Sequence, residues 1–231
     1  MRGLFLSGAL LAAVTASAAV GCEDGFVSLF NGKDLSGWEG ATTNGRFRVD
    51  ADGTLVCVKN GDWKARPLNI WTEREYTNFV FRFEFLPSQN VNNGVGIRAP
   101  NGESVTASGV EIQMLEDEST DYYYVKRPLK PYQYNCSVYG VLAAKRQSER
   151  KGYLRPFGEW NEEEICANGS HLTVTLNGET VIDADLSRFD ADGGTPDGKR
   201  HPGLRRASGH ISWCWHDGQV KYRNVRIREL K

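Results

Sequence analysis

The residues best suited to chemistry lie in one strand-like segment, 109–118, which reads Gly-Val-Glu-Ile-Gln-Met-Leu-Glu-Asp-Glu. Alternation with a period of two places the apolar side chains on one face, and Glu111 and Gln113 on the other. A carboxylate and an amide in the middle of a strand suit the floor of a groove that binds a hydroxyl-rich ligand, where the carboxylate can act as a base. The alternative is an ordinary solvated strand face.

Other segments with the same period predict the strands that must position this groove. Four phenylalanines alternate with polar or smaller residues along Phe79–Phe85, so this aromatic face is expected in the core. The sequence Asn92-Asn93-Gly94 predicts a turn. In the strand expected after it, Val95 and Ile97 face inward, while Arg98 shares the opposite face with two glycines.

A hairpin and a bulge are predicted in the C-terminal half of the chain. Two alternating segments, His171–Leu176 and Glu179–Asp183, flank Asn177-Gly178, a dipeptide that favours a two-residue type I′ turn. The final strand, Gln219–Leu230, changes phase near Arg223-Asn224, which predicts a bulge or a bend at that point.

The pattern as a whole indicates an all-β domain. No helical pattern of useful length occurs between Cys22 and Lys231, so little regular helix is expected. Many strands joined by Gly- and Asn-rich turns predict two packed antiparallel sheets, in a sandwich or jelly roll. Two connections, 117–135 and 187–206, are longer than is usual in a compact domain and are therefore candidates for functional loops.

The N-terminus has the layout of an export signal: Arg2, then an apolar run, then small residues ending at Cys22. The run is too short to span a membrane stably. Because small residues directly before a cysteine resemble a bacterial lipobox, we expect residues 1–21 to be a lipoprotein signal peptide, Cys22 to be lipidated, and residues 22–231 to form a single domain. Ordinary cleavage after Ala18 is the alternative. Either way the protein is expected to be exported, to the periplasm or the cell surface, with its lipid anchor in the outer membrane.

Charge content argues against some classes of partner, and cysteine content bears on disulfides and structural zinc. The 28 Lys and Arg nearly balance the 29 Asp and Glu, for a net charge of −1. Nucleic acid is therefore not an expected partner, and membrane contact is expected only through the lipid anchor at Cys22. The cysteines at 57, 136, 166 and 214 permit two disulfides in an oxidising compartment, although free buried thiols are an equal alternative. Their spacing argues against structural zinc.

A series of short motifs occurs in order from about Phe26 to Lys231. The motifs are Phe26–Trp38, Tyr76–Phe79, Asn92–Pro100, Gly109–Gln113, Ser137–Gly140, Gly158–Asn161, the hairpin at Asn177-Gly178, and Tyr222–Leu230. Taken together they resemble the 3-keto-disaccharide hydrolase family of bacterial exported proteins. The resemblance implies a concanavalin A-like jelly-roll sandwich of two curved antiparallel sheets, with carbohydrate bound on the concave sheet.

The resemblance also implies action on glycosides that are already oxidised at sugar C3. A ketone there acidifies the C2 proton, so a base can remove it, the enolate can expel the C1 substituent, and water can then add. Glu111 matches the glutamate of the family's Glu-x-Gln strand and is expected to be the base or a metal ligand. Gln113 is expected to hold a sugar oxygen, Arg98 to stabilise the enolate charge, and Tyr139 to donate a proton or stack.

Two histidines match positions that the family often carries, His201 in the second long loop and His216 near the end of the chain. Imidazole titrates at about pH 6.5, so both are candidate acids, bases or metal ligands. We expect His216 to take part in catalysis, and His201 and Trp160 to bind substrate. No cofactor is certain. A divalent metal is a candidate, with Glu111, Asp117, His201 and His216 as ligands, although no local ligand spacing supports it.

Three functions remain open, each with carbohydrate as the partner. The first is cleavage of 3-keto-glycosides by a hydrolase or lyase. The second is a non-catalytic carbohydrate-binding module that uses tryptophans as stacking platforms. The third is a laminarinase-type glycosidase, which needs two carboxylates about 5–5.5 Å apart. Alternation places Glu116 on the opposite face from Glu111 unless a bulge intervenes, so the third function ranks last.

Overall fold

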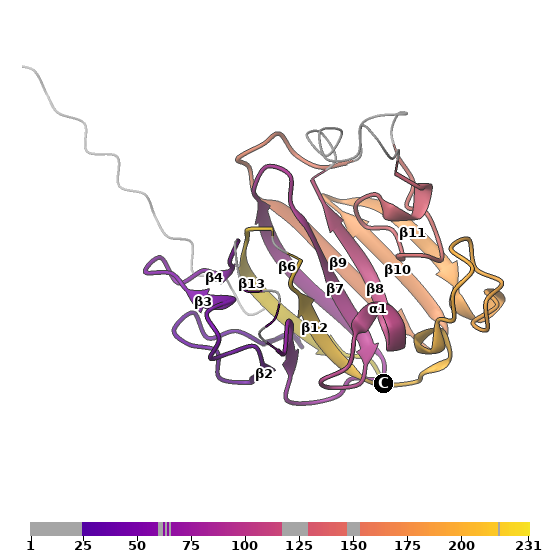
Figure 1. Cartoon of the computed structure of the whole chain (residues 1–231), viewed down its shortest axis with the longest axis horizontal. Helices are drawn as coiled ribbons and strands as arrows, with labels where there is room; N and C mark the ends of the chain where they lie inside the picture. The colour runs from indigo at the N-terminus through magenta and orange to yellow at the C-terminus, as the bar shows by residue number, and fades with distance from the viewer. Residues whose placement is uncertain are drawn as a thin grey trace, which may run out of the picture.

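The computed structural model describes residues 25–59, 62, 64, 66–116, 129–146, 153–216 and 218–231. These residues form two antiparallel sheets that pack face to face (Figure 1). The larger sheet contains β1 (Val27–Ser28), β3 (Phe47–Val49), β4 (Leu55–Cys57), β6 (Phe79–Pro87), β9 (Asn161–Asn168), β10 (His171–Leu176), β11 (Glu179–Asp185) and β13 (Val220–Glu229). The smaller sheet contains β2 (Trp38–Gly40), β5 (Ile70–Thr72), β7 (Asn92–Ala99), β8 (Val110–Leu115) and β12 (His210–Cys214).

Strand order follows from the pairing of these segments. The larger sheet runs β11-β10-β9-β6-β13-β4-β3, with β1 added beside β13, and the smaller sheet runs β2-β5-β12-β7-β8. Figure 1 shows β12, β7 and β8 next to one another in front of the larger sheet. The predicted fold class, an all-β concanavalin A-like jelly-roll sandwich, is confirmed.

Helix is scarce, as the sequence predicts. The short helical segments are α1 (Val105–Ser108), η1 (Pro131–Gln133), η2 (Leu186–Arg188) and η3 (Pro202–Arg205). Within the described ranges, no helix is long and apolar enough to cross a membrane.

The core forms where the aromatic face of β6 meets the smaller sheet. All four phenylalanines of Phe79–Phe85 are fully buried, as their alternation predicts. Trp213 of the smaller sheet lies between the sheets, its ring centroid 3.9 Å from that of Tyr222 and 4.9 Å from that of Phe83. Such aromatic contacts add stabilisation of about 0.5–1.5 kcal/mol per pair beyond burial. Trp213 is therefore a core residue and is unavailable as a stacking platform for a sugar.

Two local predictions in the C-terminal half are confirmed. The turn between β10 and β11 has positive φ angles at Asn177 and Gly178, 51° and 88°, as a two-residue type I′ turn requires. In β13 the register with β6 shifts between Arg223 and Arg226, with Asn224 at φ 52°, so the predicted bulge is present.

The predicted turn at Asn92-Asn93-Gly94 is wrong. These residues begin β7, and the chain instead turns before them, where Asn90 takes a positive φ of 58°. The strand forms here because Asn92–Gly94 pair with Leu115–Gln113 of β8, and this pairing outweighs the local turn preference.

Each of the four described cysteines is free. Cys57, Cys136 and Cys214 are buried, and Cys166 is partly buried. Of the two alternatives from the sequence, the structure has the free thiols. The predicted signal peptide and Cys22 lie outside the described residues.

Candidate functional site

A cavity of about 680 Å³ lies over the outer face of the smaller sheet. Three strands line its floor, through Trp71 of β5, Cys214 of β12 and Glu111 of β8. Adjacent residues on these strands, such as Ile112 and Trp213, belong to the core, so alternation turns the lining side chains away from the core. The walls are three loop segments, residues 66–69, 102–106 and 215–216. We call this hollow the Glu111 cavity.

Gly94 of β7 lets the Glu111 side chain lie across the sheet, and Gly96 of the same strand lets Val105 of α1 pack closely. Gly94 and Gly96 are buried on the strand next to β8, and Gly96 pairs with Glu111 itself. A Cβ atom added at Gly94 would overlap Oε1 of Glu111, and one added at Gly96 would lie 2.7 Å from methyl carbons of Val105. The sequence prediction that Glu111 faces away from the apolar side chains of its strand therefore agrees with the structure.

Glu111 is a buried carboxyl group with one polar partner in the cavity wall. Its residue is 7% exposed, and the Thr106 hydroxyl donates a 2.5 Å hydrogen bond to Oε2. Burial raises the pKa of Glu111 to about 6, and the hydrogen bond from Thr106 opposes this shift. At neutral pH the group is therefore mostly ionised, yet it is a stronger base than an ordinary glutamate.

Cys214 and His216 are among the other titratable groups that line the same cavity as Glu111. Burial, with a smaller contribution from the Glu111 charge, raises the pKa of the Cys214 thiol well above its usual value, so this thiol stays protonated. His216 is exposed, and its backbone N–H donates a 2.9 Å hydrogen bond to Asn93 Oδ1. The predicted pairing of Glu111 with His216 in one site is therefore consistent with the geometry.

A buried arginine holds one wall of the cavity. Arg46 is 1% exposed, its Nη1 donates to the Pro67 carbonyl at 3.1 Å, and its Nη2 donates to the Asp62 carbonyl. The guanidinium carbon lies 4.6 Å from the centroid of the Trp215 ring, a cation–π contact. The Trp215 indole N–H donates to the Val58 carbonyl at 2.6 Å. These contacts fix the wall segment and occupy one face of the Trp215 ring.

Trp71, on the cavity floor, carries a buried hydrogen-bond donor. The residue is 2% exposed, and its indole Nε1–H has no hydrogen-bond partner among the described residues. A Cβ atom added at Gly40 of β2 would lie 2.6 Å from Cε3 of Trp71. Because Nε1 is on the opposite edge of the indole from Cε3, it points away from β2, toward the middle of the sheet. A buried donor without a partner is costly unless a ligand completes it.

Gln113 and Tyr139 lie near Glu111 but do not line the cavity. The side-chain amide of Gln113 donates to Asn92 Oδ1 at 3.0 Å, and the residue is 4% exposed. The backbone N–H of Tyr139 donates to the Glu111 carbonyl at 2.9 Å, while its ring meets that of Tyr132 edge-on. Residues 136–139 thus extend the sheet beyond β8.

His201 belongs to a separate buried pair beyond the β8 edge. Its Nε2 lies 3.0 Å from Asp197 Oδ1, and the two side chains are 5% and 6% exposed. Although burial tends to raise the pKa of Asp197, hydrogen bonds from His201, the Lys199 N–H and Thr195 together lower it. A Cβ atom added at Gly140 would overlap Asp197, so the pair packs against that glycine. His201 therefore does not share the cavity with Glu111.

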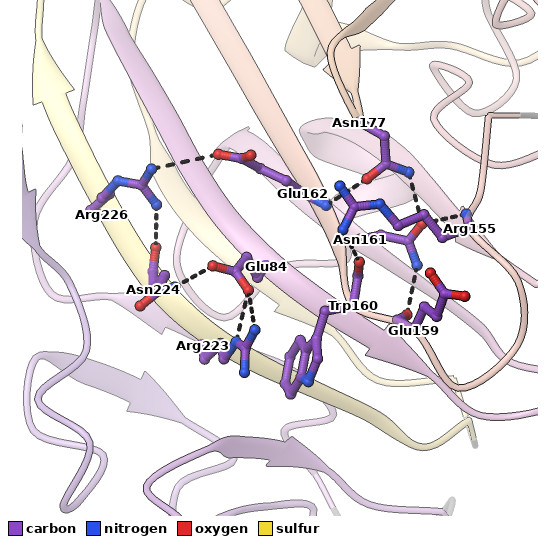
Figure 2. A network of polar contacts seen from close by, with 10 residues as sticks. All are labelled: Glu84, Arg155, Glu159, Trp160, Asn161, Glu162, Asn177, Arg223, Asn224 and Arg226. Carbon is purple, nitrogen blue, oxygen red and sulfur yellow. Dashed lines mark hydrogen bonds and ion pairs between the residues drawn. The ribbon is translucent and has the colours of Figure 1, made fainter. Parts of the chain in front are cut away.

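Arg98 and Trp160 also lie away from the Glu111 cavity. Arg98 takes a positive φ of 52° at an irregularity of β7, and its guanidinium donates to the Gly169 carbonyl at the turn between β9 and β10. The expectation that Arg98 shares a face with the two glycines is wrong, because this bulge redirects the side chain. Trp160 lies against the outer face of the larger sheet, where the Arg223 guanidinium is 4.1 Å from its ring centroid and binds Glu84 (Figure 2).

The metal-ligand set suggested by the sequence does not gather in the described residues. Glu111 and His216 line one cavity, but His201 pairs with Asp197 elsewhere, and Asp117 lies outside the described residues. No group of three or more His, Cys, Asp or Glu side chains in the described part of the chain could hold a metal ion. These residues do not fit a metal centre.

The residues that the sequence interpretation missed are Thr106, Arg46 and the neighbouring thiol, Cys214. Thr106 lies on α1, five residues before Glu111 in the chain. This short sequence separation was the one signal that could have identified it. Arg46 and Cys214 reach the site through long-range packing, for which the sequence carries no local signal.

Two sequence comparisons support a common family. A sequence model of the 3-keto-alpha-glucoside-1,2-lyase-like domain matches residues 25–228. A relative from Bacteroides thetaiotaomicron named 3-keto-disaccharide hydrolase is 23% identical over 245 residues, which cover 90% of this chain and 79% of the relative.

Two solved structures from Parabacteroides distasonis, both assigned provisionally to the glycosyl hydrolases, have a similar fold. One is 28% identical with a TM-score of 0.72, and the match covers 89% of this chain and 99% of that chain. The other is 22% identical with a TM-score of 0.74, and the match covers 90% of this chain and 95% of that chain. The similarity therefore extends over both sheets.

Proposed function

Since the chain belongs to the 3-keto-alpha-glucoside-1,2-lyase-like family, whose sequence model matches residues 25–228, we propose that it cleaves 3-keto-glycosides in the Glu111 cavity. The observation that carries this proposal is the buried Glu111 carboxyl group, with its pKa raised to about 6, in the floor of a cavity of about 680 Å³. Cavities of this size accommodate small organic ligands.

Glu111 is the base in this proposal. The C3 ketone acidifies the proton on C2, and a general base is most effective when its pKa lies close to the working pH. The pKa of Glu111 lies close to neutral pH because the carboxyl group is buried and forms no ion pair within the described ranges. After proton removal, the enolate expels the C1 substituent and water adds to the unsaturated sugar.

Two other residues of the cavity complete the chemistry. The enolate oxygen at C3 needs a hydrogen-bond donor, and the buried Trp71 Nε1–H is a donor without a partner in the described structure. The leaving oxygen at C1 needs a proton, for which the exposed imidazole of His216 in the same cavity is the proposed donor. Arg98 was the first candidate for the enolate, but its position outside the cavity removes it from this role.

The test uses pairs of glycosides that differ only at C3, one with the hydroxyl and one with the ketone. The purified protein should release the C1 substituent from the ketone form alone. Glu111→Gln should lower kcat/KM by about 10²–10⁴-fold, the usual contribution of a general base. Glu162→Gln, which changes an exposed carboxylate on the outer face of the larger sheet, is the matched control and should keep wild-type activity.

Other outcomes separate the alternatives. Turnover of neither form, together with sugar binding that survives Glu111→Gln, would favour the non-catalytic binding module. Turnover of the hydroxyl form alone would favour a conventional glycosidase. The carboxylate pair of Glu111 and Glu116 is not formed in this cavity, because Glu116 accepts the Asn90 N–H at 3.1 Å and does not line it.

A further inference from the structure

A second cavity, of about 530 Å³, lies where loops from both sheets meet. Arg98 at the end of β7 lines it, together with four loop segments. These segments include Leu186, Phe189, Leu204, Arg205 and Arg206. Three of the lining residues are arginines, and none is acidic. We call this hollow the Arg98 cavity.

The charge of Arg98 is buried without a carboxylate. The residue is 2% exposed, and its guanidinium donates to the Gly169 carbonyl. Its Nε–H has no hydrogen-bond partner, and no carboxylate pairs with Arg98 anywhere in the described residues. Burial lowers the pKa of Arg98, although an arginine stays protonated. An unpaired buried charge is costly, and an anion would remove most of that cost.

The backbone conformation at residue 98 directs the Arg98 side chain toward the Arg98 cavity. Its φ of 52° is unusual for a residue with a side chain, and it lies at the irregularity in the pairing of β7 with β12. A Cβ atom added at Gly209 would overlap the backbone of Arg98, so a glycine is needed for the close approach. Backbone strain of this kind is often found at ligand sites.

Arg206 provides a second positive group at the rim. Its Nε donates to the Ser108 carbonyl at 3.1 Å, and no carboxylate pairs with it among the described residues. By contrast, Arg205 pairs with Asp192 at 3.0 Å. Asp185 precedes the lining segment that begins at Leu186, and its Oδ1 accepts hydrogen bonds from the Ser187 N–H and hydroxyl. The cavity therefore has a net positive lining.

We propose that the Arg98 cavity binds an anionic small molecule of monosaccharide size, whose carboxylate, sulfate or phosphate group pairs with Arg98 and Arg206. The cavity is much larger than a single inorganic anion, and Leu186, Leu204 and Phe189 give it apolar walls for the rest of the molecule. A guanidinium with free N–H groups suits an oxyanion, which it can bind through two parallel hydrogen bonds. This site is separate from the Glu111 cavity and does not depend on cleavage of 3-keto-glycosides.

Calorimetric titration of the purified protein tests the proposal. The probes are glucuronate, glucose 6-sulfate and glucose 6-phosphate, with glucose and inorganic sulfate as comparisons. At least one sugar anion should bind. Glucose should bind at least about tenfold more weakly, since it lacks the charged group and a hydrogen bond to such a group contributes a factor of this size. Inorganic sulfate should also bind at least about tenfold more weakly, since it lacks the ring that contacts the apolar walls. Arg206→Ala should raise the dissociation constant of that sugar anion about tenfold or more.

The matched control is Arg200→Ala, which removes an exposed arginine outside the cavity that pairs with Asp192. This variant should bind like the wild type, and Glu111→Gln should also bind like the wild type, which separates this site from the first. Arg98→Gln should abolish binding, with folding checked by circular dichroism. The proposal is overturned if no sugar anion binds, if inorganic sulfate binds as tightly, or if Arg206→Ala and Arg200→Ala have equal effects.

Discussion

Glu111 has the properties of a base because of where its strand places it. The carboxyl group is 7% exposed and receives one side-chain hydrogen bond, from Thr106, so burial dominates its pKa. Since an elevated pKa appears when the charged form is poorly solvated, the same geometry explains both the basicity and the position on the cavity floor.

The pH dependence of activity should report on this group. With the pKa of Glu111 raised to about 6, kcat/KM should fall about tenfold per pH unit well below pH 6, as the base becomes protonated. Thr106→Val removes the hydrogen bond that lowers this pKa, so the inflection should move to higher pH. A pH–rate profile of both proteins measures the shift.

Ser104→Ala is the control for that profile, because Ser104 lines the cavity but makes no side-chain bond to Glu111 in the described contacts. Its inflection should match that of the wild type. An inflection in the Thr106→Val profile at or below the wild-type value would contradict the assignment of Glu111 as the titrating base.

Glu163 is a second buried carboxyl group, in the core rather than in a cavity. It is 1% exposed on the inward face of β9, and the Cys136 thiol contacts it. Burial raises the pKa of Glu163 from 4.5 to about 8, so the group is mostly neutral at pH 7. Alternation alone could not predict that Glu163 is buried, because the pattern does not distinguish a buried neutral carboxyl group from an exposed ionised one.

The stability of the fold should therefore depend on pH through Glu163. Its folded-state pKa lies above the unfolded value, so the folded chain holds the extra proton between about pH 4.5 and about pH 8. The stabilising contribution is complete below pH 4.5 and is lost as the pH rises through 8. Glu163→Gln should remove this loss and make the protein more stable than the wild type at pH 8, by up to a few kcal/mol.

Urea unfolding at pH 5 and pH 8 measures the effect. The exposed neighbour on the same strand provides the control, Glu162→Gln, which should keep the pH dependence of the wild type. Equal pH dependence in Glu163→Gln and the wild type would show that Glu163 titrates normally in the folded protein.

At the scale of the strand, β7 determines how the site is built. Its Gly94 lets Glu111 of the neighbouring strand lie over it, and its end carries the irregularity that redirects Arg98 into the second cavity. The same strand therefore borders both cavities. Its glycine backbone lies beneath Glu111, and Arg98, which has a positive φ, lines the second cavity.

Gly94→Ala tests this arrangement directly. The new methyl group would overlap Oε1 of Glu111 and displace the carboxylate from Thr106, so kcat should fall at least about tenfold through misplacement of the base. The folded protein should also lose about 1–3 kcal/mol, the usual cost of overpacking. Activity and unfolding free energy are both measured.

A double mutant distinguishes this overlap from a general effect on the strand. In a Glu111→Ala background the obstructing side chain is gone, so Gly94→Ala should cost less than about 0.5 kcal/mol. If the cost in that background equals the cost in the wild type, the methyl group disturbs the strand itself and the overlap with Glu111 is not its cause.

Local sequence signals predicted the elements that depend on local chemistry. The Asn177-Gly178 turn and the bulge near Arg223-Asn224 follow from backbone preference and from phase, so the sequence was sufficient. At Asn92–Gly94 the same kind of signal failed, because pairing with β8 outweighs turn preference. The prediction of the face on which Arg98 lies failed for a related reason. Alternation assumes a regular strand, and Arg98 lies at a bulge.

At the scale of the whole molecule, the sandwich distributes the predicted site residues over several surfaces. Glu111 and His216 meet on the outer face of the smaller sheet, Trp160 lies on the outer face of the larger one, and His201 lies beyond the β8 edge. Motifs in order along the chain identified the family and its fold, but which motifs converge depends on sheet order, which a single sequence does not encode locally.

The N-terminal prediction concerns how the whole protein is held in the cell. A lipobox-like sequence before Cys22 predicts that residues 1–21 are removed and Cys22 is lipidated. Expressed in a Gram-negative host, the protein should be recovered with the membrane fraction, and mass spectrometry should find a mature chain that begins at a lipid-modified Cys22. Cys22→Ser should be absent from the membrane fraction, because the acyl chains supply the attachment.

Cys166→Ser is the matched control, since it also removes one thiol, from a partly buried position in β9, and should remain with the membranes. A wild-type mature chain that begins at Ala19 without lipid would instead establish ordinary cleavage after Ala18. Because the predicted anchor at Cys22 is not among the residues that line either cavity, we expect the membrane to leave both cavities accessible. Detergent release of the wild type should therefore leave kcat/KM for a soluble 3-keto-glycoside within about twofold, whereas a larger change would mean that the domain itself contacts the membrane.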